Sequence, residues 1–207
     1  MRANPFLWIL SSLVCTLTAT PVYEVVRLTM YWVVHESSMK LGSDTALKTC
    51  RGQILANVSH QFALKIRLEG SGVLRNGRII NLSNCKCKPG TDFSCFQEVR
   101  EPLGSFDNIL IPFISIATNG TNFGKTAYSP EMDGWIMPNG LRHNGCLRVD
   151  DDCPACSNNH IDFFVWNETN YLDLVRRYPI SRLHLSYNRY CQLLNWNNEF
   201  KKKLLLS

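Results

Sequence analysis

The sequence of 207 residues has little that would place it in a membrane or on nucleic acid. A membrane-spanning helix needs about 20 consecutive apolar residues, and the longest apolar stretch, within residues 5–15, is shorter. The formal net charge is small, at +5, and part of it comes from the three lysines at 201–203. No run of basic residues alternates with aromatic residues, as is typical of nucleic-acid-binding surfaces. We therefore expect no membrane and no nucleic-acid partner, and we interpret residues 196–207 as a solvated basic tail.

Motifs of several large enzyme classes are missing. The sequence contains no G-x-S-x-G elbow, no H-E-x-x-H pair and no phosphate-binding loop, which leaves serine hydrolase, zinc peptidase and nucleotide chemistry without support. It also contains no internal repeat and no low-complexity linker. A composition of 45% hydrophobic and 19% charged residues is that of an ordinary globular protein. We expect one compact, monomeric domain with an N-terminal extension and no bound cofactor.

The N-terminal segment has the parts of a secretory signal peptide. Arg2 is followed by an apolar run that extends to Val14, and small residues occupy positions 18–20. A basic start, a short apolar core and small residues at the cleavage site are typical of such signals. A buried helix or a membrane anchor is the alternative, but the apolar run is too short for a span. We predict that residues 1–20 are removed, leaving a secreted product that begins with an extension over residues 21–59.

Cysteines that remain after removal of Cys15 are even in number, which favours disulfides in an oxidising compartment. Their pairing cannot be read from spacing. Cys85 and Cys87 are too close to bond comfortably with each other, so we expect them to have different partners. The cysteines assigned to disulfides are Cys50, Cys85, Cys87, Cys95, Cys146, Cys153, Cys156 and Cys191.

Four N-x-S/T sequons accompany the predicted signal peptide. One sequon occurs often by chance, but several in a cysteine-rich secreted chain indicate N-glycosylation. The sequence therefore predicts passage through a eukaryotic secretory pathway. The acceptor residues are Asn57, Asn81, Asn119 and Asn167.

Short β-branched and aromatic runs separated by Gly, Pro and Asn turns dominate the chain, and this pattern favours a barrel or sandwich of short strands. One helix is expected at 168–177, where Asn167 or Thr169 can cap it and Pro179 stops it. A closing strand is expected at 182–187, with Cys191 able to staple the tail onto the barrel. The other predicted strands are 30–34, 62–68, 78–80, 109–117, 146–149 and 160–165.

Acidic residues gather around one predicted strand-turn-strand segment. Asp150, Asp151 and Asp152 end one strand, and Asp162 lies inside the next apolar strand. A carboxylate in such a run is costly to bury without a partner, so it should either accept hydrogen bonds or line a cleft. These acids are our candidates for the functional site.

Cys153 and Cys156, between these strands, have the C-x-x-C spacing of redox pairs and zinc sites. A redox pair would open a helix after a strand, which this context lacks. A zinc site would need His143 and His160 as further ligands. Structural disulfides fit an oxidising environment best, and we assign no metal site. Trp135, like the other tryptophans of this half, suits either core packing or stacking on a sugar ring.

At these residues the chain resembles the three-aspartate (3D) domain family. These are double-psi β-barrels that include the catalytic domain of membrane-bound lytic transglycosylase A and secreted fungal proteins. The resemblance covers most of residues 60–190, and its most specific part is D-D followed eleven positions later by I-D. The matching segments are I-P-F-I-S-I-A (111–117), G-K-T-A-Y-S-P-E-M-D-G (124–134), P-N-G-L-R-H-N-G-C-L-R-V-D-D (138–151), N-H-I-D-F-F-V (159–165) and the opening hairpin L-E-G-S-G-V-L-R-N-G-R-I-I-N (68–81).

The resemblance implies a mainly β fold: a six-stranded double-psi β-barrel over residues 60–195, with an N-terminal β extension and one short helix in the C-terminal half. It also implies cleavage of β-1,4 glycosidic bonds in a cell-wall polysaccharide without water, forming a 1,6-anhydro sugar. The carboxylic acid that protonates the leaving oxygen must keep its proton near neutral pH. By this resemblance Asp151 is the acid/base and Asp162 its neighbour in the cleft, or the acid itself. The residues expected to bind substrate are Asn119, Asp150, His160 and Trp135.

The chain departs from the family pattern at two places. The first aspartate of the family falls at Asn119, and the glycine-rich stretch after the second is replaced by residues 152–158. Two hypotheses follow: a secreted polysaccharide-cleaving protein, or a non-catalytic module that binds wall glycan or another protein through the same groove.

Overall fold

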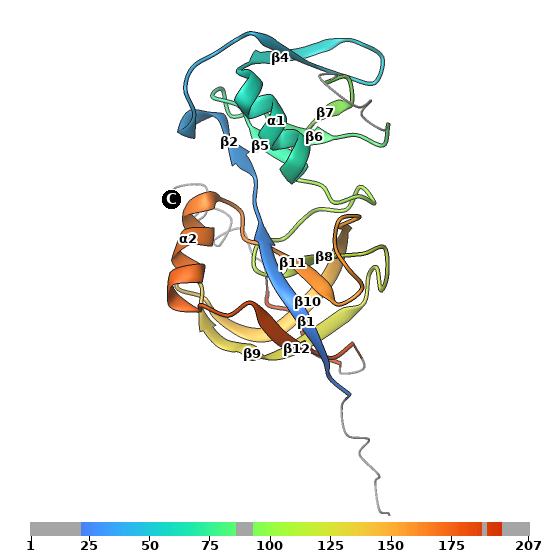
Figure 1. The fold of residues 1–207 in the computed structure, drawn as a ribbon, viewed down its shortest axis with the longest axis vertical. Helices are drawn as coiled ribbons and strands as arrows, with labels where there is room; N and C mark the ends of the chain where they lie inside the picture. Colours follow the sequence, from blue (N-terminus) through green and yellow to red (C-terminus); the bar gives the residue numbers. More distant parts are fainter. Residues whose placement is uncertain (1–21, 86–92, 188–189, 196–207) are drawn as a thin grey trace, which may run out of the picture.

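The computed structural model describes residues 22–85, 93–187 and 190–195. The predicted signal peptide, Cys87 and the predicted tail at 196–207 lie outside these residues. The described chain forms a six-stranded barrel sheet and, above it in Figure 1, a smaller lobe over residues 34–99, which we call the upper lobe. No helix in this part of the chain is long and apolar enough to cross a bilayer.

The barrel sheet mixes parallel and antiparallel neighbours, with β1 parallel to β11, β8 parallel to β10, and the other pairs antiparallel. The edge strands β9 and β12 approach each other, and an isolated bridge between Tyr128 and Ser186 nearly closes the sheet. The predicted six-stranded, mainly β barrel is therefore confirmed. The strands in sheet order are β12 (Arg182–Leu185), β1 (Glu24–Tyr31), β11 (His160–Phe164), β8 (Ser115–Thr118), β10 (Arg142–Asp152) and β9 (Thr126–Ile136).

Alternation along each barrel strand separates a core face from an outer face. Leu28 pairs with Ile161, and Ile116 pairs with Phe163; all four are buried in one apolar cluster with Leu147. Neighbouring residues on these strands, including Asp151 and Asp162, therefore point to the outside of the barrel. Strand β1 comes from the segment that we expected to be an extension, and it continues directly into the upper lobe (Figure 1).

A second apolar cluster holds the upper lobe together. Helix α1 packs on a four-stranded sheet through Phe62 and Ile66, which are fully buried with Ile80 and Phe96. A hairpin completes the lobe. The elements are β2 (Val34–His35), the short 3-10 helix η1 (Glu36–Ser38), β3 (Thr45–Lys48), β4 (Ile54–Val58), α1 (His60–Glu69), β5 (Ser71–Val73), β6 (Ile79–Leu82) and β7 (Phe96–Val99).

The strand predicted at 62–68 is wrong, because this segment is helix α1. Its alternating apolar pattern matches a strand, but Phe62 and Ile66, four residues apart, lie on one helical face. Ser59 caps the helix by accepting a hydrogen bond from the Phe62 N–H, and Gly70 ends it at a positive φ of 87°. The capping serine was the sequence signal that favoured a helix here.

Helix α2 (Glu168–Arg177) confirms the helix predicted at 168–177. Asn167 caps it, with Oδ1 accepting a hydrogen bond of 2.8 Å from the Asn170 N–H. Near its C-terminal end, Arg176 and Arg177 form ion pairs with Asp173, which also suits the helix dipole.

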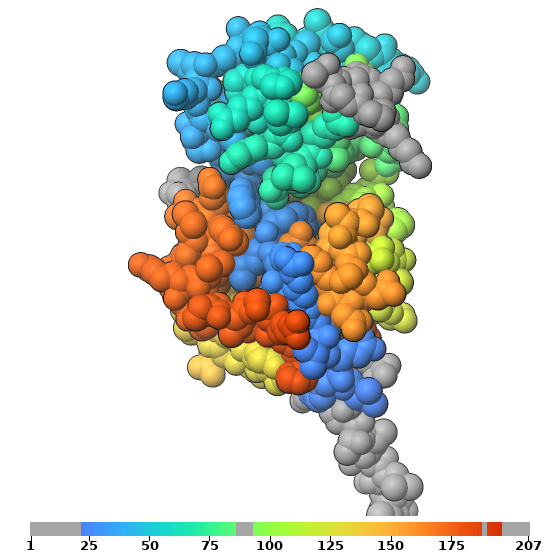
Figure 2. Space-filling view, viewed as in Figure 1, coloured from blue at the N-terminus to red at the C-terminus, as the bar shows by residue number. Residues whose placement is uncertain are grey.

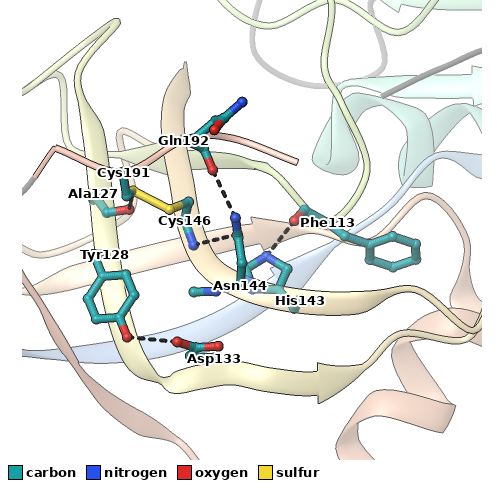
Figure 3. The surroundings of a disulfide bond; sticks show 10 residues. Phe113, Ala127, Tyr128, Asp133, His143, Asn144, Cys146, Cys191 and Gln192 are labelled. Carbon is teal, nitrogen blue, oxygen red and sulfur yellow. Dashed lines mark hydrogen bonds between the residues drawn. A yellow bond between two sulfur atoms is a disulfide. The ribbon is translucent and has the colours of Figure 1, made fainter. Parts of the chain in front are cut away.

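Disulfides fasten both lobes. Cys50 pairs with Cys85, Cys146 with Cys191, and Cys153 with Cys156, and Cys95 is also disulfide-bonded. Cys146–Cys191 holds the segment after β12 against β10, as predicted, and Asn144 Nδ2 adds a 2.8 Å hydrogen bond to the Gln192 carbonyl (Figure 3). Cys153 and Cys156, the C-x-x-C pair, are bonded to each other.

Candidate functional site

Four side chains form a row across the outer face of the barrel. Thr29 of β1 pairs with Asp162 of β11, Asp162 pairs with Ala117 of β8, and Ala117 pairs with Asp151 of β10. Residues in register on neighbouring strands point to the same face. We call these residues the acid row. The two acids are two strands apart, or about 10 Å between backbones, and Ala117 between them is only 3% exposed, so other side chains cover this part of the row.

A β-bulge decides which aspartate of the run joins the row. The register between β8 and β10 shifts between Val149 and Asp151, so Asp150 is the extra residue. Asp150 is only 3% exposed and is held by the Ser115 hydroxyl and by Arg148 Nε at 2.6 Å. The bulge therefore turns Asp150 into a structural ion-pair partner and places Asp151 on the outer face.

Asp162 has few hydrogen bonds for a half-buried carboxyl. Its Oδ1 accepts a bond of 2.8 Å from the Thr29 hydroxyl, and that hydroxyl lies 2.7 Å from His160 Nε2. Because the Thr29 proton is donated to Asp162, His160 Nε2 donates to Thr29. Burial, and next the charge of Asp151, raise the pKa of Asp162 to about 6, against the opposing bond from Thr29. About half of Asp162 is therefore protonated at pH 6, and a minor fraction keeps the proton at pH 7.

Asp151 is held much more firmly. Its Oδ1 accepts hydrogen bonds from the Ser105 N–H at 2.8 Å, the Ser105 hydroxyl at 2.7 Å and the Asp152 N–H at 2.8 Å. Its Oδ2 accepts one from the Tyr31 hydroxyl at 3.1 Å. Burial still raises the pKa of Asp151, although these bonds oppose the shift. Such a carboxylate is suited to fixing the geometry around it.

Glu69, at the C-terminal end of α1, is a third carboxyl near the row that sequence reasoning did not identify. Its Oε2 lies 3.5 Å from the Trp32 N–H, just past the end of β1. Burial raises the pKa of Glu69 to about 7, and the charge of Asp162 contributes to the shift. The hairpin expected over 68–81 gives no reason to select Glu69, and only the tertiary packing of α1 brings it to the acids.

The other predicted substrate residues divide between the site and the core. His160 reaches the row through Thr29. Asn119 lies just past the end of β8, where its Nδ2 donates to Asn158 Oδ1 at 3.2 Å. Trp135 is not at the site: it is 5% exposed on β9 and stacks on Tyr178 at a centroid distance of 4.3 Å.

The surface view shows the molecule hollowed where the upper lobe meets the barrel (Figure 2). The acid row lies on the barrel side, under the upper lobe, since Ser105 and Glu69 approach it from loops and helix outside the barrel sheet. Within the described residues, no group of three or more His, Cys, Asp or Glu side chains is arranged to hold a metal ion. The site offers paired carboxyls, hydroxyls and one imidazole for proton transfer.

The predicted glycosylation sites differ in exposure. Asn57 is exposed on β4, whereas Asn81 is 4% exposed. Asn81 Oδ1 accepts from the Ser71 hydroxyl and from the Leu103 N–H at 3.0 Å, and its Nδ2 donates to the Leu82 carbonyl at 2.9 Å. An N-glycan is attached through Nδ2, so the folded chain has no space for one at Asn81.

No family model matches the sequence, and no curated protein does. The fold does match solved structures. Escherichia coli MltA, a structure with bound chitohexaose, aligns with a TM-score of 0.52 and 12% identity over 78% of this chain and 70% of that one. A membrane-bound lytic murein transglycosylase from Agrobacterium tumefaciens aligns with a lower TM-score of 0.44 and 13% identity, over 66% of this chain and 52% of that one. The lytic transglycosylase LtgG of Burkholderia pseudomallei gives 0.40, with 14% identity over 79% and 70%. The similarity to MltA is one of fold, and it identifies the barrel as MltA-like.

Proposed function

We propose that this protein is secreted and cleaves β-1,4 glycosidic bonds of a cell-wall polysaccharide, with Asp162 as the acid/base. The observation that carries the proposal is the acid row, in which a half-buried carboxyl with a pKa of about 6 faces the outside of the barrel. The MltA-like fold supports it, because a structure of that fold is known with bound chitohexaose. The resemblance of the aspartate motifs to the three-aspartate family supports it further.

In the proposed reaction, protonated Asp162 donates its proton to the glycosidic oxygen as the bond to the anomeric carbon breaks. The ionised carboxylate then takes a proton from the sugar's own 6-hydroxyl, whose oxygen attacks the anomeric carbon and forms a 1,6-anhydro ring. One carboxyl therefore serves as acid and then as base, and no water is consumed. Proton transfer of this kind contributes about 10²–10⁴-fold in rate.

Asp151 acts as a positioning residue in this proposal. Four hydrogen bonds occupy its oxygens, so it is less free than Asp162 to exchange a proton with substrate. Its charge helps to raise the pKa of Asp162. We therefore propose Asp162, the alternative that the sequence left open, as the acid in place of Asp151.

Non-catalytic glycan binding is the second candidate. It is favoured by Asn119, which stands where the family has its first aspartate, and by the Cys153–Cys156 disulfide in place of a glycine-rich stretch. Asn119 bonds to Asn158 in this rebuilt turn. A non-catalytic protein of this kind would still bind the glycan but would not cleave it.

Product analysis separates the two candidates. The protein secreted from eukaryotic cells is incubated with peptidoglycan, chitin and β-glucan beside the Asp162→Asn variant and a control, Glu24→Gln, at an exposed residue of β1. Mass spectrometry should show anhydro-sugar fragments from the parent and the control, and at least about 100-fold fewer from Asp162→Asn. Co-sedimentation of all three proteins with one polymer, without fragments from any, would establish the binding module instead.

A further inference from the structure

A cavity of about 520 Å³ lies between the upper lobe and the start of α2. It is lined from one side by Trp32, His35 and Lys65, and from the other by Trp166 and Asn167. Successive side chains of an extended chain point to opposite sides, so Trp32 faces away from the side on which Tyr31 reaches Asp151. The cavity is therefore separate from the acid row. In Figure 1, the start of α2 faces the upper lobe.

The lining suits a neutral ligand that is rich in hydroxyl groups. His35 Nε2 is buried and has no hydrogen-bond partner among the described residues, and burial lowers the pKa of this imidazole, which keeps it neutral. An unpaired buried nitrogen is unfavourable, and a hydroxyl can pair with it as donor or acceptor. Trp32 adds an aromatic surface, stacked on Tyr171 at 4.8 Å. Arg75 is already bonded to the Met39 carbonyl at 2.6 Å, and the lining holds the opposite charges of Lys65 and Glu168, so the cavity carries little net charge to select an anion.

The chain itself places a sugar acceptor at the rim of this cavity. Asn167, Glu168 and Thr169 form a sequon, and all three line the cavity. Asn167 Oδ1 is used to cap α2, accepting from the Asn170 N–H at 2.8 Å. Nδ2 is the atom to which an N-glycan is attached, so a glycan and the helix cap are compatible. The His35 and Trp166 rings, 6.4 Å apart, lie beside this acceptor.

The backbone that presents Asn167 is strained. Trp166 has a φ of 74°, which is unfavourable for a bulky residue. The turn is fixed by the Asn167 N–H donating to the Val165 carbonyl at 3.1 Å and by the Val33 N–H donating to the Trp166 carbonyl at 2.9 Å. The second bond ties the turn to the segment that joins the lobes. Strain of this kind persists where the surroundings or a function maintain it.

We infer that the first sugar of an N-linked glycan on Asn167 occupies this cavity and joins the upper lobe to the barrel. In the transfer, Asn167 Nδ2 bonds to the anomeric carbon of a sugar carried on a lipid pyrophosphate. The carbon–oxygen bond to the phosphate breaks, its electron pair leaves with the pyrophosphate, and Nδ2 loses one proton. The inference rests on the secretion in the proposed function and is independent of the cleavage reaction.

The test uses protein secreted from eukaryotic cells. Thr169→Ala removes the sequon but keeps the Asn167 cap, Thr169→Ser keeps the sequon, and Asn57→Gln removes a glycan from an exposed site. Glycopeptide mass spectrometry should show Asn167 occupied in the parent and in Thr169→Ser. Thr169→Ala should lower the Tm by about 2–4 °C, whereas the other two variants should leave it unchanged. Trimming the parent's glycans to the first sugar should also leave the Tm unchanged.

A bare Asn167 in protein whose Asn57 is glycosylated would overturn the inference, as would protein without any N-glycan. Equal Tm losses in Thr169→Ala and Asn57→Gln would overturn it too. His35→Leu provides a second readout: it should lower the Tm of glycosylated protein but not that of Thr169→Ala, because the nitrogen has a partner only when the sugar is present. The same loss in both backgrounds would contradict the occupancy of the cavity. Fragment release by the acid row is measured separately, so failure of one proposal leaves the other standing.

Discussion

At the scale of single residues, the environment of each carboxyl separates three similar acids. Asp150 is paired with Arg148, and Asp151 is held by Ser105 and Tyr31. Within the described part of the chain, Asp162 accepts a hydrogen bond from Thr29 alone. Burial, and after it the charge of Asp151, raise the pKa of Asp162 to about 6, because this carboxyl has the fewest hydrogen bonds to oppose the shift. Fewer stabilising contacts make a carboxyl a better proton donor near neutral pH.

Stability should depend on pH through Asp162. Its pKa is raised from 3.8 to about 6 in the folded state, so the folded protein holds this proton more tightly than the unfolded chain. Its contribution is most favourable below pH 4, falls as pH rises to 6, and is constant above. Asp162→Asn should therefore be about 1–3 kcal/mol more stable than the parent at pH 8 and equal to it at pH 4. Urea denaturation at both pH values measures this, and an equal difference at both would contradict it.

The pH profile of cleavage should follow the same group. Because Asp162 must be protonated to donate, kcat/KM should fall as pH rises through about 6. Asp151→Asn removes a negative charge that raises the pKa of Asp162, so the fall should move to lower pH. Initial rates measured on one soluble oligosaccharide across pH 4–8 test the shift. If kcat/KM fell at the same pH in both proteins, the charge of Asp151 would have no effect on the pKa of Asp162.

At the scale of elements, the segment from Leu103 to Ile109 connects the acid row to the rest of the chain. Its two ends form a bridge, and Ser105 between them donates twice to Asp151. Gly104 makes this approach feasible, because a Cβ there would lie 2.3 Å from the Asp150 carbonyl oxygen. A backbone oxygen, unlike the end of a flexible side chain, cannot move aside without moving the strand.

Gly104→Ala should therefore push this segment away from β10. We expect a loss of about 1–3 kcal/mol in unfolding free energy and a larger fractional loss of cleavage, since both Ser105 bonds lengthen. Ser105→Ala is the matched comparison, because it removes the hydroxyl bond and keeps the N–H bond. Thermal unfolding and initial rates should rank the parent first, Ser105→Ala second and Gly104→Ala last; parent-like behaviour of Gly104→Ala would refute the role of the segment.

The elements also show how far the sequence predicts the structure. Strands around Ile116, Val149 and Ile161 and the capped helix α2 follow from local pattern. However, β8 covers only the end of the predicted strand 109–117, and β10 extends three residues past the predicted end at 149, which brings Asp151 into the strand. Helix α1 was missed because its apolar residues alternate as in a strand. The bulge at Asp150 and the approach of Glu69 could not be predicted, because both depend on register and packing between distant segments.

At the scale of the whole molecule, two lobes with separate apolar cores meet beside the acid row and around the cavity of about 520 Å³. Strand β1 belongs to the barrel and continues into the upper lobe, so the lobes share one backbone segment next to Tyr31. Disulfides lie within each lobe: Cys50–Cys85 in the upper lobe and Cys146–Cys191 in the barrel. Relative placement of the lobes therefore depends on contacts at their junction.

Removal of the Cys146–Cys191 disulfide should lower the stability of the protein more than its activity. Cys146 and Cys191 close a loop with a sequence separation of 45, and replacing both with serine should cost about 2–4 kcal/mol. The acid row should keep its geometry, because none of its hydrogen bonds involves these residues. Urea denaturation paired with the fragment assay checks both statements; an unchanged midpoint would show that the disulfide adds nothing.

The most direct test of the central claim is an NMR titration of the Asp162 carboxyl carbon in the intact protein, assigned by its loss in Asp162→Asn. We predict a pKa of about 6, and a lower value in Asp151→Asn. A value near the ordinary pKa of an aspartate, about 3.9, would contradict the account, because almost no Asp162 would then be protonated at pH 6, where the account expects about half of it to hold the proton that glycosidic cleavage requires.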